Sequence, residues 1–398
     1  ILEVEPLLSG ALRFTALDID RPHLRLRPDD AETDILSMGE MMEAVDRIAA
    51  IVDEEFRKRD LSEVRLRNGR VDVVGPVPRR INEIDAVLRR DRQGGILAEA
   101  EIVGRMGVWD LGLRRAVNPE HGERQIGLYV RDMALAELFP SNEQVGSGKG
   151  LGLPLEIQFN ANLGADGKFE SANLVARGQD GWFRSGQTVI RFDDVALALG
   201  WAAGHPGVVI GKSHVIRGDT EIFFTGAVRP PAAGAVDWTY EIDADRARFG
   251  SVDVQEPAVV ADYLSLDGRV DLAAKVLFLD RLQLHSGSAV FRAIGSLDLR
   301  EDGPYLALAA DAEAMPVSVL KQIWPVTLTP PARRWVIEHL KGGLIQSASV
   351  DASVRPPAFD EAHPDAGWGG DDLKLHINLV NTEVAPLATL PAITDLTG

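Results

Sequence analysis

The stretch Leu155–Leu163, LEIQFNANL, decides the fold class, because apolar and polar residues alternate along it without a break. Successive side chains of a strand point to opposite faces of a sheet, so this stretch has one apolar and one polar face. The apolar positions are Leu155, Ile157, Phe159, Ala161 and Leu163, and the polar positions are Glu156, Gln158, Asn160 and Asn162. Ala165–Gly167 follows as a turn signal. The stretch therefore predicts a strand with water on one face only.

The same period of two recurs along most of the chain. Further apolar sets are Val195, Leu197, Leu199 and Trp201; Trp238, Tyr240, Ile242 and Ala244; and Leu373, Leu375, Ile377 and Leu379. Turn signals separate such runs at Asn68–Gly69, Asp180–Gly181, Arg217–Asp219, Asp267–Gly268, Asp302–Gly303 and Gly369–Gly370. We expect roughly eighteen strands, mostly antiparallel because short turns join them. The runs have no fixed repeat length, which argues against a propeller or β-helix.

Residues 39–58 break this pattern with helical spacing. The periodic apolar residues are Met41, Val45, Ile48, Val52 and Phe56, and we expect Glu43, Asp46, Asp53 and Glu54 elsewhere on the surface. The spacing predicts an amphipathic helix of about five turns that packs on a sheet. Its polar face is acidic rather than basic, which argues against a helix lying on a membrane surface.

A second helical segment lies in Trp324–Gly343, WPVTLTPPARRWVIEHLKGG. Pro330–Pro331 preset a helix start, Thr329 can cap it, and Gly342–Gly343 end it where a positive φ is favourable. The segment is predicted to be an end cap or separator that buries two indoles against the sheet, or a gate over a groove. The residues expected to do this are Trp324, Trp335 and Leu340.

Two helices cannot cover so many apolar strand faces. The faces must cover each other, as in a sandwich or barrel, or contact something other than protein. An apolar concave face left open for a ligand satisfies the second possibility. We therefore expect a mainly β fold, an elongated twisted antiparallel sheet that forms a groove, with two or three short helices. The expected segments are N-terminal strands in 1–35, a helix in 36–60, the β-groove in 61–314, a helical interruption in 315–343 and a further β repeat beginning in 344–398.

Composition excludes several functional classes. Sixty acidic and 42 basic residues give a net charge of -18, which repels nucleic acid in the absence of a basic patch. The chain has no cysteine, so disulfides and thiolate metal sites are excluded, and this composition is compatible with a periplasm. No run approaches the ~20 apolar residues of a membrane-spanning helix. Because the sequence starts at Ile1 rather than methionine, we expect an internal piece of a longer protein.

Motifs for catalysis or metal binding are missing from the sequence. The eight histidines have no spacing typical of metal ligands. The glycine-rich stretch Gly146–Gly152 lacks the Ser or Thr of a phosphate loop. Neighbouring carboxylates such as Asp193 and Asp194 would point to opposite faces of a strand. We predict no enzyme, no cofactor and no metal site.

The helical segment, followed by SASVDASVR at 347–355, resembles the AsmA-like superfamily, in particular its YhdP-type proteins of Gram-negative bacteria. The opening ILEVEPLLSGALRFTALDIDRPHLRL is similar to the segment that follows the membrane anchor in that family, and the helix at 39–58 followed by VRLRNGRVDV also fits. The resemblance implies a bridge-like lipid-transfer groove. It would carry phospholipid acyl chains between inner and outer membranes in the periplasm, with inner-membrane anchoring through segments outside this chain.

Three functions remain open: a lipid-conducting groove, a non-enzymatic envelope scaffold or outer-membrane assembly factor, and an enzyme on a β scaffold. The groove is favoured, with phospholipid acyl chains and both membranes as partners and no nucleic acid. The candidate groove residues are Leu155, Ile157, Phe159, Leu163, Val195, Leu197, Leu199, Trp201, Trp238, Tyr240, Ile242, Leu373, Leu375, Ile377 and Leu379.

Overall fold

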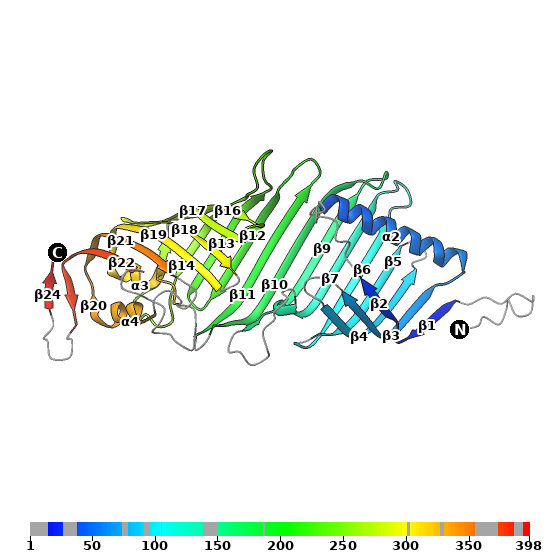
Figure 1. The fold of residues 1–398 in the computed structure, drawn as a ribbon, viewed down its shortest axis with the longest axis horizontal. Coiled ribbons are helices and arrows are strands. Elements are labelled where there is room, and N and C mark those ends of the chain that lie inside the picture. Colours follow the sequence, from blue (N-terminus) through cyan, green and yellow to red (C-terminus); the bar gives the residue numbers. More distant parts are fainter. Residues whose placement is uncertain are drawn as a thin grey trace, which may run out of the picture. The chain divides into compact units, whose positions relative to one another are not determined.

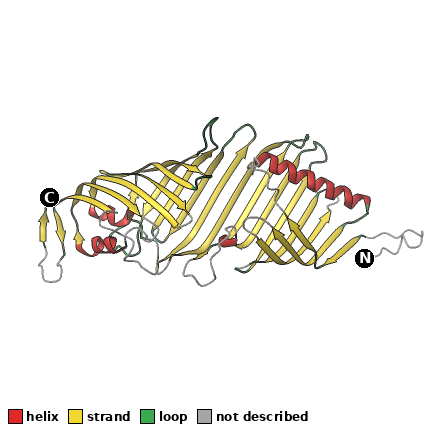
Figure 2. Cartoon of the chain, viewed as in Figure 1, coloured by secondary structure: helices red, strands yellow, loops and turns green. Residues whose placement is uncertain are grey.

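The computed structural model describes residues 15–26, 38–73, 79–90, 95–104, 106–137, 150–185, 188–300, 303–326, 330–354, 373–385 and 393–398. Strands make up 66% of the structure, and the helices are few (Figure 2). Twenty-one strands belong to one open, twisted sheet, and three short strands form another. The predicted mainly β fold class is therefore confirmed, although the strands outnumber the expected eighteen. The chain divides into unit 1, residues 1–191 and 196–205, and unit 2, residues 192–195 and 206–398.

Unit 1 contains a long antiparallel meander with two parallel strands at its start (Figure 1). Its elements are β1 Ala16–Asp20, β2 His23–Leu26, α2 Met38–Lys58, β3 Glu63–Val73, β4 Arg79–Arg90, β5 Ile96–Val103, β6 Val108–Val117, β7 Arg124–Ala134, η1 Leu135–Glu137, β8 Gly150–Gly152, β9 Pro154–Leu163 and β10 Phe169–Ser185. Strands β3 to β7 pair in chain order, β9 pairs with β7 and β10, and β8 pairs with β10. Strand β11, Thr188–Ala202, has residues in both units.

The parallel pairs were not predicted from the sequence. Both β1 and β2 lie parallel to β3 and precede α2 in the chain. Parallel neighbours need a crossover connection, usually helical, and α2 supplies it. Helix α2 therefore both connects strands and lies across the sheet of unit 1 (Figure 1).

Unit 2 is antiparallel in every pairing of its described strands. Its elements are β12 Val208–Arg217, β13 Thr220–Arg229, β14 Trp238–Phe249, β15 Val259–Ala261, β16 Tyr263–Asp271, β17 Val276–Ser286, β18 Ala289–Arg300, β19 Gly303–Pro316, α3 Val317–Ile323, α4 Pro330–His339, β20 Leu340–Lys341, β21 Leu344–Val354, β22 Leu373–Val380, β23 Thr382–Val384 and β24 Ile393–Leu396. Helices α3 and α4 lie within the interruption expected at 315–343. The boundary between the units falls in β11, inside the segment expected to be one continuous groove.

Some glycine-containing turn signals are correct and others mark irregular strands. Ala165–Gly167 and Arg217–Asp219 do connect neighbouring strands. Asn68–Gly69 was predicted to be a hairpin turn, but it lies inside β3, where the register with β4 shifts and Asn68 has a φ of 53°. The turn predictions at Asp180–Gly181 and Asp267–Gly268 are wrong too, because β10 and β16 continue through them. Asparagine, aspartate and glycine tolerate positive φ, which bulges need as much as turns do. Asp302 and Gly369–Gly370 lie outside the described residues.

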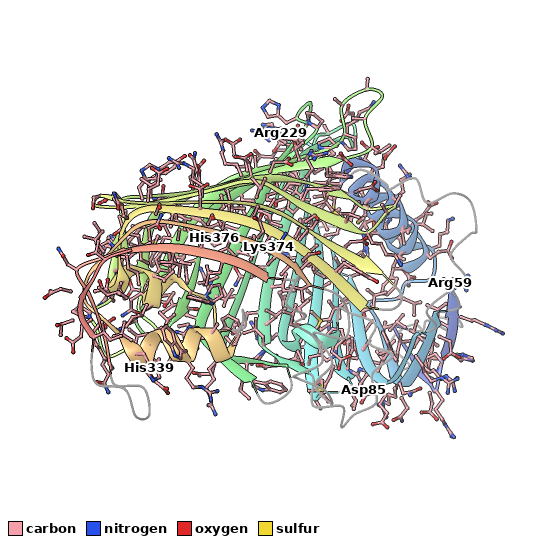
Figure 3. All side chains as sticks on the ribbon, turned by 60° about the vertical axis from the view of Figure 1, so that its left-hand side comes forward. Arg59, Asp85, Arg229, His339, Lys374 and His376 are labelled. Atoms are coloured by element: carbon pink, nitrogen blue, oxygen red, sulfur yellow. The ribbon has the colours of Figure 1, made fainter. Side chains whose placement is uncertain are left out.

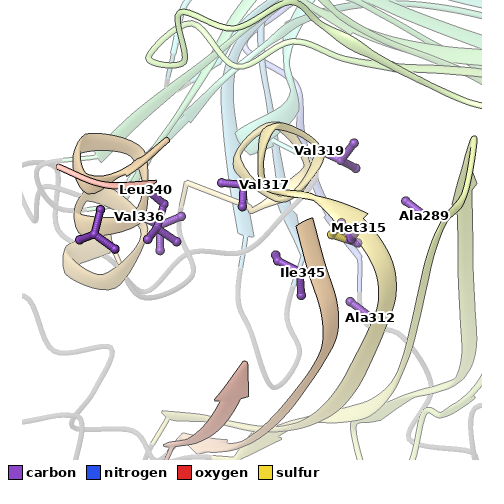
Figure 4. Packing of buried hydrophobic residues seen from close by; sticks show 9 residues of the cluster. Ala289, Ala312, Met315, Val317, Val319, Val336, Leu340 and Ile345 are labelled. Atoms are coloured by element: carbon purple, nitrogen blue, oxygen red, sulfur yellow. The ribbon is translucent and has the colours of Figure 1, made fainter. Parts of the chain in front are cut away.

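Buried apolar side chains gather where helices meet the sheet. Beneath α2 the buried cluster contains Met42, Ile126, Phe159, Ala161, Leu163 and Ala172. In unit 2 a cluster around α3 and α4 contains Met315, Val317, Val319, Val336, Leu340 and Ile345 (Figure 4). No helix in the described ranges is both long enough and apolar enough to span a membrane.

Candidate functional site

Strand pairing in unit 1 aligns apolar residues into rows that cross the strands. The first row is Val64, Leu88, Ala98, Leu113, Leu128, Phe159 and Leu174. The second row is Leu66, Ala86, Ala100, Leu111, Val130, Ile157 and Ala176. Only Phe159 and Val130 among these are fully buried, and the others are half-buried. The two rows form a continuous, partly accessible apolar surface across seven strands, which we call the unit 1 floor.

The opposite face of the same strands is polar. One row there is Glu63, Arg89, Leu97, Arg114, Gly127, Asn160 and Asn173. Arg89 donates a hydrogen bond to Glu63 over 2.9 Å, and both side chains belong to this wet face. The predicted division of Leu155–Leu163 into an apolar and a polar face is confirmed by its alternating burial.

Unit 2 has three apolar rows, which we call the unit 2 floor. The first is Ile210, Gly226, Ile242, Leu266, Leu282, Ala293, Ala310, Val350 and Leu375. The second joins positions Val208, Val228, Tyr240, Gly268, Leu279, Gly295, Leu308, Ala352 and Leu373. The third is Trp238, Val270, Leu277, Leu297, Leu306 and Val354. These rows contain no charged residue. Their polar side-chain groups are the Trp238 indole N–H and the Tyr240 hydroxyl, and this hydroxyl donates to the Phe278 carbonyl over 2.8 Å.

The other face of unit 2 carries the charges. A representative row is Thr225, Asp243, Ser265, Gln283, Arg292, Asp311, Ser349 and His376 (Figure 3). Lys374 and His376 are exposed and alternate along β22 with Leu375 and Ile377. A shallow cavity of about 560 Å³ on this polar face is lined by residues including Phe278, Ser296 and Lys374. Small side chains leave this cavity open. Because it lies on the polar face, the cavity is not a continuation of the unit 2 floor.

Most of the residues predicted for a groove do share an apolar face within their unit. Trp238, Tyr240 and Ile242 occupy the three rows of unit 2 and are half-buried. Leu375 lies in the first row with 41% exposure, while Ile377 and Leu379 pack partly against the core near α3. The backbone places Leu373 opposite Ala352. Val195, Leu197, Leu199 and Trp201 are half-buried in β11.

Three candidate groove residues are buried in the protein core, although one of them, Phe159, is also a member of the first row of the unit 1 floor. Phe159 and Leu163 are buried in the cluster beneath α2, and Leu155 is buried with Val130 and Met133. Alternation in the sequence identifies the face of the sheet on which these residues lie, but not what covers that face. Here other side chains of the protein cover it. Of the predicted β9 set, Ile157 alone is half-buried, and it packs partly against the cluster that contains Leu155.

Charges attach α2 to unit 1, which corrects the predicted position of Asp46 on the surface. Asp46 is only 4% exposed, accepts a hydrogen bond from Arg115 Nε over 2.7 Å and another from Arg124 Nη1 over 3.0 Å. Asp53 accepts from Arg90 Nε over 2.5 Å. A buried arginine needs a compensating carboxylate, so these pairs determine which side of α2 faces the strands.

The predicted apolar stripe of α2 is therefore turned partly away from the sheet. Glu43 accepts a hydrogen bond from the Phe169 backbone N–H, at the strand ends. With 3.6 residues per turn, Met41, Val45 and Ile48 lie on the opposite flank of the helix, where Val45 packs partly against the cluster beneath α2. Met41 is 44% and Ile48 63% exposed. This apolar flank, which includes Val52 and which we call the side wall, is partly accessible.

The helical segment of unit 2 behaves differently from its prediction. Leu340 is buried and Trp324 packs partly against the core cluster, as expected of a cap. Trp335 is 41% exposed and stacks on His339 with ring centroids 5.3 Å apart, so burial of both indoles is wrong. The gate interpretation of these residues stays untested.

The described residues hold no cluster of three or more potential metal-binding side chains. Asp193 and Asp194 do not form a pair: Asp194 contacts His214 Nε2 at 2.9 Å, and Asp193 accepts from the Gly218 backbone. No family model, curated protein or solved structure matches the chain.

Proposed function

We propose that the apolar floors bind phospholipid acyl chains. The observation that carries this proposal is the set of apolar rows on one face, most of whose members are half-buried rather than buried, opposed by polar rows on the other face. An ordinary core would be covered and close-packed. An open apolar surface of this extent favours an apolar ligand or partner.

The direction of the rows matches a linear hydrocarbon. Neighbouring rows are separated by two residues of strand, roughly 6.8 Å. In unit 1, Leu113, Leu128 and Leu174 of the first row pack partly against the cluster beneath α2, and Leu111 and Ile157 of the second row pack partly against the cluster of Val130, Met133, Leu153 and Leu155. The half-buried members of both rows leave an apolar strip that is partly accessible. Each methylene buried on such a strip stabilises the complex by about 0.8 kcal/mol, so a long chain gains steadily along it.

The wider setting is part of the same proposal and comes from the resemblance to AsmA-like proteins. It comprises transfer of phospholipid between the inner and outer membranes, a periplasmic location and inner-membrane anchoring outside this chain. A non-enzymatic envelope scaffold of the same architecture is the competing function.

Mass spectrometry of organic extracts from the purified protein, combined with site-specific photo-crosslinking, tests the proposal. A photoreactive residue at Leu282, in the first row of the unit 2 floor, should capture lipid. The matched control is Gln283, half-buried like Leu282 but on the polar face. Equal capture at both positions, or no lipid in extracts and no capture at Leu282, favours the scaffold function instead.

A further inference from the structure

A polar cavity in unit 2 lies apart from the floors. It has a volume of about 710 Å³ and is bounded by the loop before β15 and by α3 and α4. Its lining residues include Asp253, Glu256, Lys321 and Arg333. None of them belongs to an apolar row of the unit 2 floor, so this cavity needs its own explanation.

The cavity contains an ion pair with unused hydrogen-bonding capacity, in which the Lys321 side chain is buried and the Glu256 side chain is 31% exposed. Lys321 is 1% exposed, and Nζ donates to Glu256 Oε1 over 2.6 Å. An ammonium group has three N–H donors, and this is the one hydrogen bond of Lys321 within the described structure. The other carboxylate oxygen, Glu256 Oε2, is buried without a partner among the described residues. Unsatisfied groups of this kind are costly and rare, and they point to a missing partner.

Surrounding hydrogen bonds hold the pair in place. Gln322 Nε2 donates to the Glu256 carbonyl over 2.7 Å, and Gln322 Oε1 accepts from the Ser251 backbone over 2.7 Å. Arg333 donates to both oxygens of Asp253 and to Ser251 Oγ. Loop, α3 and α4 are thus joined by buried polar side chains, so the cavity is preorganised.

The two unused groups require hydrogen-bonding groups of opposite kind on a ligand. The free donors of Lys321 require an oxyanion or another acceptor, whereas Glu256 Oε2 requires a donor. A simple anion would leave the carboxylate oxygen unpaired and would be repelled by it. We propose that the cavity binds a small zwitterion in which an oxyanion lies close to an N–H-bearing ammonium group. Its oxyanion contacts Lys321 and its ammonium donates to Glu256.

Isothermal titration calorimetry with three soluble probes tests this site. Phosphoethanolamine and glycine carry N–H donors with a phosphate or a carboxylate, respectively, and phosphocholine is a matched control whose quaternary ammonium cannot donate. We expect one site per chain for phosphoethanolamine or glycine, the tighter one identifying the oxyanion. Phosphocholine should bind at least about tenfold more weakly, because it leaves Glu256 Oε2 unpaired. No binding of any probe, or equal binding of phosphocholine, overturns the proposal.

Two variants locate the binding. Lys321→Met removes the donors and should abolish binding, while Lys58→Met, at an exposed lysine on α2, should leave it unchanged. Glu256→Gln keeps an oxygen for Lys321 but presents N–H groups to the ammonium, so it should lower affinity at least tenfold even if Lys321→Met does not fold. Unchanged affinity in Glu256→Gln contradicts the proposal. These probes carry no acyl chain, so the outcome is independent of lipid binding on the floors.

Discussion

Unit 1 and unit 2 both attach helices through buried apolar side chains together with ion pairs, but the charged partners lie on different elements. Helix α2 is attached through Asp46 and Asp53 to arginines on the strands, and its flank leaves Met41 and Ile48 exposed. Helix α3 buries Val317 and Val319 in a core cluster, and its Lys321 pairs with Glu256 in the loop before β15. Helix α2 likewise buries Met42, Ala49 and Phe56, so both helices combine apolar packing with ion pairs. Only α2 pairs its carboxylates with arginines on the strands themselves.

The largest expected effect comes from breaking the charged attachment of α2. Asp46→Ala leaves Arg115, 7% exposed, without its carboxylate, and should lower the free energy of unfolding of unit 1 by about 3–5 kcal/mol. Chemical denaturation monitors this change. Glu54→Gln, at an exposed position of the same helix, should cost less than about 0.5 kcal/mol. If both variants are equally stable, the ion pairs of Asp46 contribute little and the buried Met42, Ala49 and Phe56 hold α2 in place.

Two leucines on one face of β17 allow the protein core and the unit 2 floor to be compared. Leu284 is buried in a core cluster, so Leu284→Asp should cost several kcal/mol and unfold unit 2. Leu282 is half-buried on the floor, where water can reach a charge, so Leu282→Asp should fold yet bind less lipid. Circular dichroism and lipid extraction measure the two effects. If both variants unfold, the unit 2 floor is an ordinary protein core.

Acid unfolding tests the polar attachment of α4 in unit 2. Hydrogen bonds from Arg333 lower the pKa of Asp253 to about 2 from its ordinary 3.8, against the opposing effect of burial. A lowered folded-state pKa adds stability that is complete above pH 3.8 and is lost as the pH falls toward 2. Asp253→Asn should therefore be less stable than wild type at neutral pH, and the difference should shrink between pH 4 and 2. The Asp253 side chain is 48% exposed, so the effect is modest. Tryptophan fluorescence during acid titration measures it, and a difference that is constant with pH argues against this attachment.

The smallest stability effect is expected on the free flank of α2. Ile48→Gln changes a side chain that is 63% exposed, so the free energy of unfolding should shift by less than about 0.5 kcal/mol. Lipid captured by a photoreactive residue at Leu111 on the unit 1 floor should nevertheless decrease, because the side wall loses apolar surface. Arg47→Gln, on the polar side of the helix, serves as the control. If both variants capture the same amount of lipid, Ile48 is not part of the lipid-contacting surface.

Alternation within single strands predicted which residues of the candidate site share a face of the sheet. It could not predict which residues form the rows of the two floors. Alternation identified Trp238, Tyr240 and Ile242 as one face, since the period of two follows from strand geometry alone. The same reasoning missed Ala100, Leu111 and other members of the floors, although short alternating runs in β5 and β6 were a usable signal. Which strands are neighbours, and hence which residues share a row, depends on pairing between segments distant along the chain.

The sequence by itself determined that this protein is made of strands with one apolar and one polar face, interrupted by a helix at 39–58 and a helical segment within 324–343, because both periods are properties of the local backbone. Only the tertiary structure decided whether Asn68–Gly69 made a turn or a bulge, since both use positive φ. It also decided the rotation of α2, because Arg115 and Arg124 lie far along the chain from Asp46. Whether an apolar face is covered depends on such distant partners, so the difference between core and open floor could not be read locally.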